Sequence, residues 1–416
     1  MSDSAPPANH SRLPREVWIL AGVNFLIAVG FGVMSPILPV YARTFGVTSF
    51  MIGLVVSSLS VLRLSTMPVS SWLLRYVGPR ELAIGGTMLI AFTTFMMGVS
   101  QTYWGLLVWR GLSGFGSALF MVSSMALLFA AAPAHQRGRA NAFSGGGFVL
   151  GGMAGPGLGG LIAAVSMHAP FFFYAGTLVV SAVVMLVWLP RTAIATRQKL
   201  RETSVGLSHL VRDRRFRAVL VVNFANGWQS FGVRNLLLPL FIAETLHLGT
   251  AWVGIAFTIA AAAQAAALPL TGWGTDRLGR RFMMLAGGLV TAAMSVGLAF
   301  SGSYVVLVVL MCVYAIGASA TGSAAQSMLA DTVPTSARSG LAAYQMAGDI
   351  GQILGPLVAG AILDAVSMQV AWLVGAVIIV LGVVLAWGTP SGIQPQVGPG
   401  LGRMVHDGRD TDGTFE

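Results

Sequence analysis

The sequence predicts an all-α polytopic membrane protein whose twelve transmembrane helices form two pseudo-symmetric six-helix bundles. Three observations support this fold class. Only 9% of the 416 residues are charged and 55% are hydrophobic, whereas about 25% of a soluble domain is charged. Apolar runs of about 20 residues, the length that crosses a hydrocarbon core, recur from Val17 to Trp387. The two halves of the chain also repeat each other.

The apolar runs place the twelve helices along the chain. Their expected ranges are 17–41, 50–73, 82–100, 104–131, 140–166, 170–189, 217–243, 251–271, 282–301, 304–330, 340–364 and 368–387. The first six form an N-terminal bundle over 17–189 and the last six a C-terminal bundle over 217–387. The polar segment 190–216 is expected to be a linker between them. Residues 1–16 form an N-terminal tail, and the Gly/Pro-rich residues 388–416 form a disordered tail.

The positions of the basic residues predict the topology. Of the 24 Lys and Arg residues, 20 lie in the tails or in alternate loops, and the intervening loops carry only Arg43. This bias places both termini, the linker and every second loop in the cytoplasm. We therefore expect a multi-pass protein of the plasma (inner) membrane, in contact with the lipid bilayer. The net charge of +10 is explained by this topology, and no nucleic-acid partner is expected.

Sequence landmarks recur at a nearly constant spacing. Phe31-Gly32 matches Phe231-Gly232, Ile37-Leu38-Pro39 matches Leu237-Leu238-Pro239, and Gly155-Pro156 matches Gly355-Pro356, each 200 residues apart. Parallel repeats of six helices, related by an axis along the membrane normal, are a known architecture of secondary transporters.

The loop between the eighth and ninth helices carries the most specific motif. It reads Gly272-x-x-x-Asp276-Arg277-x-Gly279-Arg280-Arg281. This spacing resembles the loop motif of the major facilitator superfamily, and the resemblance covers all twelve spans. It implies a cytoplasmic gating loop that closes the inner side when the transporter faces outward, with Asp276 at a neighbouring helix N-terminus. In the first-half copy Arg75 stands in place of the Asp, so that copy is expected to be a weak latch.

Two further motifs resemble the twelve-helix drug:proton antiporters of this family. The first helix carries Gly30-x5-Pro36, and the fifth carries Gly151-x3-Gly155-Pro156-x2-Gly159. The resemblance implies antiport. Small residues also let helices approach closely, so the alternative is a packing interface without any directional meaning.

Four charged residues are expected inside the spans: Arg63, Arg110, Arg234 and Asp349. Charges at that depth are costly and usually face a cavity or a partner. Arg110 also lies in a motif that resembles the fourth-helix motif of the family. With polar and aromatic residues at helical spacing, these four predict a central substrate cavity. Its expected members are Asn24, Phe31, Arg63, Arg110, Asn223, Asn226, Arg234, Gln264, Gln345 and Asp349.

Asp349 and Arg110 are the candidates for proton coupling. Asp349 is the only acidic residue well inside a span, which makes it the candidate proton carrier. The alternative is a fixed ion pair with one of the three arginines, which needs no titration.

The resulting hypothesis is a secondary active transporter that works by alternating access and exports small amphipathic or drug-like compounds in exchange for protons. Three arginines against one aspartate favour neutral or anionic cargo, so the alternative is proton-coupled uptake or export of an organic anion or metabolite. A membrane enzyme or receptor is the third class, but catalytic groups do not converge in the sequence.

We expect no cofactor and no metal, because a phosphate loop and metal-ligand spacings are absent. Cys312 is the single cysteine, and the chain is expected to work as a monomer.

Overall fold

The computed structural model describes residues 13–133, 136–190, 207–332 and 338–388, and the chain is almost entirely helical in these ranges. Eleven helices there are long and apolar enough to cross a membrane. A twelfth crossing consists of four consecutive helical segments from Arg214 to Thr245, each too short to span alone. The twelve predicted spans are therefore present.

The first six crossings form the N-terminal bundle. They are α1 (Arg15–Met34) with α2 (Leu38–Arg43), α3 (Ser49–Leu73), α4 (Pro79–Val99), α5 (Tyr103–Ala131), α6 (Arg137–Val165) and α7 (Ala169–Trp188). The first span, predicted over 17–41, is present from Arg15 to Arg43 and contains a turn between Met34 and Leu38. Pro36 and Pro39 lack the N–H groups that a continuous helix would need there.

The last six crossings form the C-terminal bundle. They are α9 (Arg214–Asn226), η2 (Gly227–Val233), α10 (Arg234–Leu240) and η3 (Phe241–Thr245) as one crossing, then α11 (Thr250–Arg277), α12 (Arg280–Ala299), α13 (Tyr304–Thr332), α14 (Arg338–Ala365) and α15 (Met368–Trp387). The helix predicted at 217–243 contains two π-helical stretches, η2 and η3, which hydrophobic periodicity does not reveal.

The segment predicted as a linker at 190–216 is helical in part. It contains α8 (Leu207–Arg212), and Asp213 caps the start of α9 by accepting a hydrogen bond from the backbone N–H of Arg215. The rest of the linker, 191–206, and the predicted tails at 1–12 and 389–416 lie outside the described residues.

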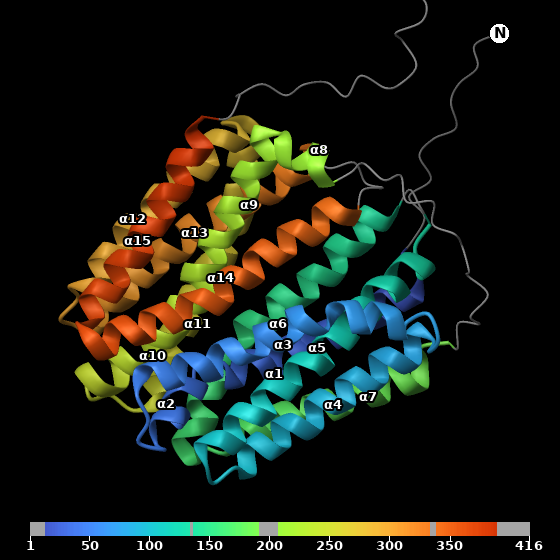
Figure 1. Ribbon diagram of the computed structural model, residues 1–416, viewed down its shortest axis with the longest axis horizontal. Helices are drawn as coiled ribbons and strands as arrows, with labels where there is room; N and C mark the ends of the chain where they lie inside the picture. Colours follow the sequence, from blue (N-terminus) through green and yellow to red (C-terminus); the bar gives the residue numbers. More distant parts are fainter. Residues whose placement is uncertain (1–12, 134–135, 191–206, 333–337, 389–416) are drawn as a thin grey trace, which may run out of the picture.

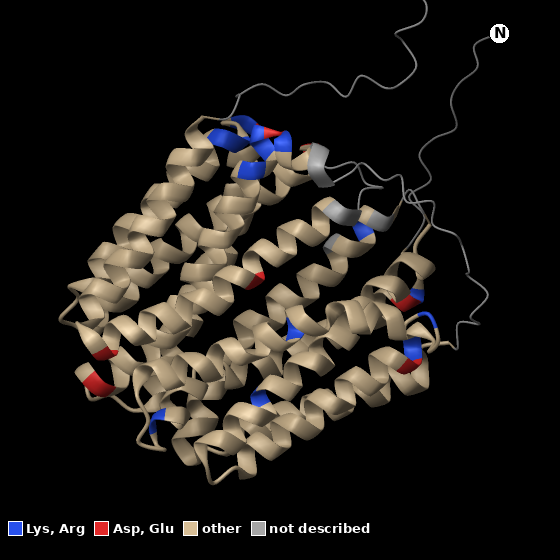
Figure 2. Ribbon diagram, in the orientation of Figure 1, with Lys and Arg blue, Asp and Glu red and all other residues tan. Residues whose placement is uncertain are grey.

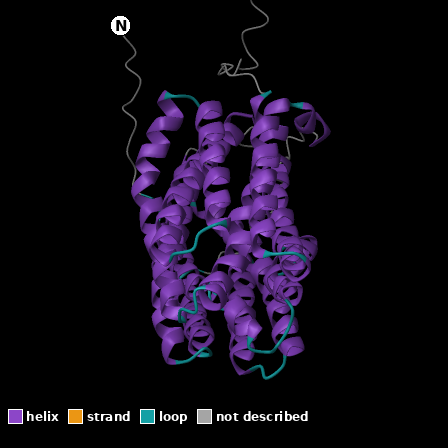
Figure 3. Cartoon of the chain, turned by 90° about the vertical axis from the view of Figure 1, so that its left-hand side faces the viewer, coloured by secondary structure: helices purple, strands orange, loops and turns teal. Residues whose placement is uncertain are grey.

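The two bundles lie side by side, and their helices run in a common direction (Figures 1 and 3). In the N-terminal bundle α1 packs on α6 and α7, while α5 packs on α3 and α4. In the C-terminal bundle α12 packs on α13 and α15, and α14 packs on α9 and η2. Most of the described Lys and Arg residues gather at one end of the molecule, and few charges lie in the middle (Figure 2).

We call the end rich in Lys and Arg residues the basic end, and the other end of the molecule the opposite end. The basic end carries the loops at 74–78 and 278–279 and the starts of α1 and α9, and the opposite end carries the loops at 44–48, 246–249 and 366–367.

The internal repeat is visible in side-chain contacts as well as in sequence. At the start of α4, Arg80 donates a hydrogen bond to the carbonyl oxygen of Leu186 at the end of α7. At the start of α12, Arg281 donates to the carbonyl oxygen of Trp387 at the end of α15. The donors are 201 positions apart, and so are the acceptors. Each arginine therefore connects the start of one helix to the end of the last helix of its own bundle, in agreement with a duplicated six-helix unit.

Candidate functional site

The bundles meet along two helix pairs, α3 with α14 and α6 with α11. In the first pair the Asp364 carboxylate accepts hydrogen bonds of 2.8 Å from the backbone N–H groups of Ser49 and Phe50. It therefore caps the first turn of α3 from the other bundle, where the helix dipole favours a negative charge. About two turns deeper, the Ser57 hydroxyl donates a 2.8 Å hydrogen bond to the carbonyl oxygen of Ile353.

The second pair is held together by glycines near the opposite end. Gly160 of α6 lies so close to Gly254 of α11 that a Cβ atom at Gly160 would meet the Gly254 Cα at 2.7 Å. A Cβ at Gly157 would meet the hydroxyl of Thr258 at 2.5 Å. Only small residues allow such an approach. The two helices therefore touch by their backbones at this end.

An ion pair adds a third contact at the opposite end. The guanidinium of Arg43, at the end of α2, lies 2.5 Å and 3.1 Å from the two carboxylate oxygens of Glu244 in η3. Arg43 also donates a 2.9 Å hydrogen bond to the carbonyl oxygen of Val47. Both members of the pair are about one-third exposed. Together with the Asp364 cap and the Gly160–Gly254 contact, this pair joins the bundles at the opposite end.

At the basic end, the described residues show no hydrogen bond or ion pair between the predicted gating loop and the N-terminal bundle. Asp276 is exposed and forms no hydrogen bond or ion pair with the described residues. Arg280 forms an ion pair with Asp331 and donates a 3.0 Å hydrogen bond to the carbonyl oxygen of Ser327, both on α13. Among the described residues, the predicted contact of Asp276 with a neighbouring helix N-terminus is therefore not found.

The remaining residues of the loop serve its turn and its own bundle. Gly279 has φ of 95°, a left-handed value that glycine adopts without strain. The guanidinium of Arg277 lies 5.3 Å from the ring centre of Trp273. Gly272 lies inside α11 with open space around its α-carbon.

A buried ion pair links the bundles between α3 and α14. Arg63 of α3 pairs with Asp349 of α14, and their side chains are 17% and 8% exposed. The Nε atom of Arg63 is buried without a hydrogen-bond partner. The sequence left open which arginine faces Asp349, and the structure assigns that contact to Arg63.

Arg110 of α5 is buried inside the N-terminal bundle, with 4% of its surface exposed. Its guanidinium lies 5.9 Å from the ring centre of Phe31 on α1, and the Phe31 ring packs edge-on against Tyr174 of α7. Among the described residues, Arg110 has no carboxylate within ion-pair distance and donates no side-chain hydrogen bond.

Arg234 opens α10 in the C-terminal bundle, and α10 contacts both α2 and α3 of the other bundle. Its guanidinium lies 5.6 Å from the ring centre of Phe257 on α11 and 5.7 Å from that of Tyr314 on α13. The Tyr314 hydroxyl is in turn 2.9 Å from the hydroxyl of Ser230. Arg234 is half-buried, and among the described residues no carboxylate pairs with it.

The polar residues predicted for the cavity divide into three groups. Asn24 donates a 2.8 Å hydrogen bond to Ser144, and Asn223 donates a 2.6 Å hydrogen bond to the carbonyl oxygen of Tyr344. Both side chains therefore connect helices within a bundle, which sequence spacing alone does not distinguish from cavity lining. Gln264 and Gln345 are half-buried and make no side-chain hydrogen bond with the described residues.

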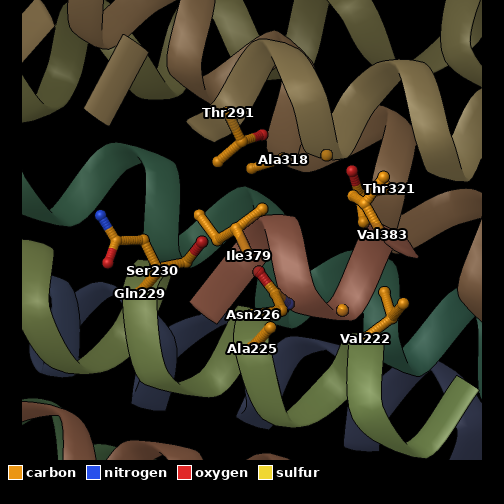
Figure 4. Close-up of a pocket in the computed structure, with 12 residues that line it drawn as sticks. Val222, Ala225, Asn226, Gln229, Ser230, Thr291, Ala318, Thr321, Ile379 and Val383 are labelled. Atoms are coloured by element: carbon orange, nitrogen blue, oxygen red, sulfur yellow. The ribbon is translucent and has the colours of Figure 1, made fainter. Parts of the chain in front are cut away.

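Asn226 lines a separate, small cavity inside the C-terminal bundle, between α9, η2, α12, α13 and α15 (Figure 4). The cavity measures about 20 Å³, room for about one water molecule. The buried Gln229 also lines it and donates a 2.9 Å hydrogen bond to Ser295. The prediction that Asn226 faces the space between the bundles is corrected accordingly.

The glycine motif of the fifth helix packs against the first helix of the same bundle. Side chains at Gly151, Gly155 and Gly159 would collide with the backbone carbonyl groups of Phe25, Val29 and Val33 on α1. The corresponding stripe on α14, Gly351 and Gly355, packs in the same way on α9 and η2. This geometry explains the spacing by close packing. Pro156 lies inside α6, where it removes one backbone hydrogen bond.

Sequence reasoning did not identify Phe257 and Tyr314, the aromatic partners of Arg234, or Tyr174, which packs against Phe31. Aromatic residues in apolar spans are usually part of the core, and their spacing carries no signal of a charged neighbour. In the described part of the chain, His, Cys, Asp and Glu do not gather into a group of three or more that could hold a metal ion.

The profile of the Major Facilitator Superfamily matches residues 20–249 and 219–399, which together cover nearly the whole chain. The chain belongs to this family. It is a multi-pass membrane transporter and not an enzyme, and the duplicated bundles agree with the two-domain fold of major facilitators.

The chain is also similar to individual transporters. The Quinolone resistance protein NorA of Staphylococcus aureus (strain MRSA252) is 31% identical over 179 residues, which cover 42% of this chain and 45% of that protein. The alignment therefore spans less than half of the relative. An uncharacterized MFS-type transporter, MJ1560 of Methanocaldococcus jannaschii, is 22% identical over 90% of this chain and 98% of its own length.

Solved structures show the same fold. A bacterial homologue of the human lysosomal transporter Spinster, in an inward-facing and unoccupied conformation, superposes with a TM-score of 0.74 at 13% identity, over 89% of this chain and 95% of that one. A point mutant of the nucleoside transporter NupG superposes with a TM-score of 0.70 at 16% identity, over 90% of this chain and 99% of that one.

Proposed function

We propose that this major facilitator is a proton-coupled exporter of small amphipathic compounds that works by alternating access. The observation that carries the proposal is the buried ion pair between Arg63 and Asp349, which joins one bundle to the other. An ionisable residue inside a span is costly and marks a functional site by default. Because the pair crosses the bundle interface, any separation of the bundles at this level also separates the two charges.

The basic end is assigned to the cytoplasm and the opposite end to the outside of the plasma (inner) membrane. The excess of Lys and Arg residues at one end supports this orientation, and it places both termini in the cytoplasm. The contacts of Arg43 with Glu244 and of Gly160 with Gly254 then close the outer side. The unengaged Asp276 is the expected arrangement of a transporter that faces inward.

Proton movement follows from the two partners available to Asp349. In the inward-facing conformation the carboxylate is paired with Arg63. When the outer side opens, α3 and α14 separate and the carboxylate exchanges Arg63 for a proton from outside. When the outer side closes again, Arg63 returns and the proton leaves toward the cytoplasm. One inward proton per cycle supplies about 2.3 kcal/mol per 100 mV of membrane potential.

The export direction is supported by resemblance rather than by geometry. The Gly30-x5-Pro36 and helix-five motifs are similar to those of drug:proton antiporters, and one relative is named for quinolone resistance. The glycine stripe itself is explained by packing on α1. Direction is therefore the part of the proposal that transport measurements decide.

A second candidate function is proton-coupled uptake or export of an organic anion or metabolite. The observation that favours it is the pair of guanidinium groups, Arg110 and Arg234, that lack a carboxylate partner among the described residues. With Arg63 neutralised by Asp349, these two charges leave each bundle with one positive group in its membrane-spanning part. Such a field favours anionic cargo and disfavours cations.

Transport in proteoliposomes with an imposed pH gradient tests both candidates. The panel contains neutral, anionic and cationic amphipathic dyes of similar size. Dye movement that reverses when the gradient is reversed supports proton coupling, and its sign gives the direction. Dye fluxes that do not change with the gradient across the whole panel contradict the proposal.

A further inference from the structure

Arg234 has the geometry of a binding group that the transport cycle above does not use. Its guanidinium is held by two rings from different helices, with the carbon Cζ 5.6 Å from the centre of Phe257 and 5.7 Å from that of Tyr314. Cation–π contacts of this length fix the position of the charge without neutralising it. The Nε atom is fully buried and has no hydrogen-bond partner among the described residues.

The charge of Arg234 is not balanced by the chain around it. Within the described residues, the carboxylates of Glu244, Asp349 and Asp331 are each paired with another arginine. A guanidinium inside a span is expensive unless it meets an anion or a polar cavity. Because the residue is only half-buried, part of its side chain reaches accessible space.

The N-terminal bundle contains a matching arrangement with the helix roles exchanged. There Arg110 lies on α5 and its aromatic partner Phe31 on α1. In the C-terminal bundle Arg234 lies on the crossing that corresponds to α1, and its partner Tyr314 lies on α13, which corresponds to α5. Each bundle therefore presents one unpaired guanidinium against an aromatic ring at equivalent helix pairs.

These groups define the chemistry of a ligand. A guanidinium presents a planar fork of N–H donors that matches the two oxygens of a carboxylate. The rings of Phe257 and Tyr314 beside it offer faces and edges for an aromatic body. A cation would be repelled, and a neutral compound would leave the fork unsatisfied.

We propose that Arg234, between Phe257 and Tyr314, binds the carboxylate of an aromatic monoanion, which is the cargo class of this transporter. The inference rests on the proposed transport function and names the cargo of the same pathway. Amphipathic carboxylates satisfy both descriptions, because they combine an apolar ring with one charge. Specificity arises from the N–H donors of the Arg234 guanidinium, because a ligand without a negative charge leaves these donors without a carboxylate partner.

Equilibrium binding to the purified full-length protein tests this assignment without any gradient. The probes are 2-naphthoate and 2-naphthamide, which share a ring system and differ in charge. Wild-type protein is expected to bind naphthoate about 10- to 100-fold more tightly than naphthamide, the range that charge-assisted hydrogen bonds provide. Arg234→Gln is expected to remove this preference and leave naphthamide binding unchanged.

Two further variants separate charge from packing. Phe257→Leu is expected to weaken both probes equally, because it removes ring contact and keeps the charge. Arg212→Gln, which removes a basic residue at the start of the C-terminal half, is expected to change neither. Equal affinity of wild-type protein for the two probes overturns the proposal even if Arg234→Gln does not fold. An unchanged naphthoate preference in a folded Arg234→Gln variant overturns it as well.

The outcome is separable from that of the transport proposal. If naphthoate shows no preference but a neutral dye still moves with the pH gradient, the anion site is refuted and proton-coupled transport stands. If naphthoate binds as expected but no probe moves with the gradient, the site stands and the coupling is refuted.

Discussion

The ion pair between Arg43 and Glu244 is predicted to hold the outer side of the transporter closed. It connects the end of α2 to η3 across the two bundles, through N–O distances of 2.5 Å and 3.1 Å. Opening the outer side must separate these residues. We therefore expect Arg43→Gln and Glu244→Gln each to increase the outward-open population relative to the inward-facing one.

The size of the effect follows from the exposure of the pair. The two side chains are 32% and 38% exposed, and pairs with this much solvent contribute about 0.2–1 kcal/mol. The two-point contact favours the upper part of that range. Since about 1.4 kcal/mol is a tenfold change, the equilibrium should shift about two- to fivefold. The two single variants should have similar effects, because the other bond of Arg43, to the carbonyl oxygen of Val47, lies within the N-terminal bundle.

Spin labels across the outer side measure this shift. Cysteines at the exposed Gln101 and Gly302 lie in loops of different bundles at that end, and the native Cys312 is replaced by serine. Pulsed electron–electron distances then give the fraction of outward-open protein. The Arg43→Gln/Glu244→Gln double variant should shift the equilibrium by less than the two single shifts combined, because either single change already breaks the pair. Single shifts that simply add, or are absent, refute the latch.

Three other predictions follow from local geometry. Gly160→Leu should abolish transport at normal expression, because the leucine side chain prevents α6 from closing against Gly254. The control is Gly152→Leu, at a position of the same helix that faces open space. Equal transport activity of the two variants contradicts the contact. Gly279→Ala should lower stability by about 1–2 kcal/mol because of its φ of 95°, whereas Gly272→Ala should not, and thermal unfolding compares them. Asp276→Asn should raise the inward-facing fraction by weakening the latch of the outward-facing state; an unchanged distance distribution at the basic end would exclude that role.

The fold was predictable because it depends on quantities that a single sequence contains. The length of the apolar runs gives the spans, and the 200-residue spacing of Phe31 and Phe231 gives the duplication. The corresponding contacts of Arg80 and Arg281 with the ends of α7 and α15 agree with it. The π-helical stretches of the seventh crossing were not predictable, because tertiary packing selects them over an ordinary helix of the same composition.

The candidate site was only partly predictable, because helical spacing gives the face of a residue but not its neighbour. The sequence offered three arginines to Asp349, and choosing Arg63 requires the register of α3 against α14. Asn24 and Asn226 looked equivalent, yet one bonds to Ser144 and the other lines a cavity inside its bundle.

The central claim is that Asp349 carries the proton by exchanging Arg63 for it, and an Asp349→Asn variant in proteoliposomes tests this most directly. Asparagine keeps the shape of the side chain and can still accept a hydrogen bond from Arg63, but it cannot release a proton. The control is Asp331→Asn, which removes a carboxylate that pairs with Arg280 outside the interface. The account predicts that Asp349→Asn loses gradient-driven transport and keeps substrate counterflow, while the control keeps both. Gradient-driven transport that persists at the wild-type rate in Asp349→Asn contradicts it.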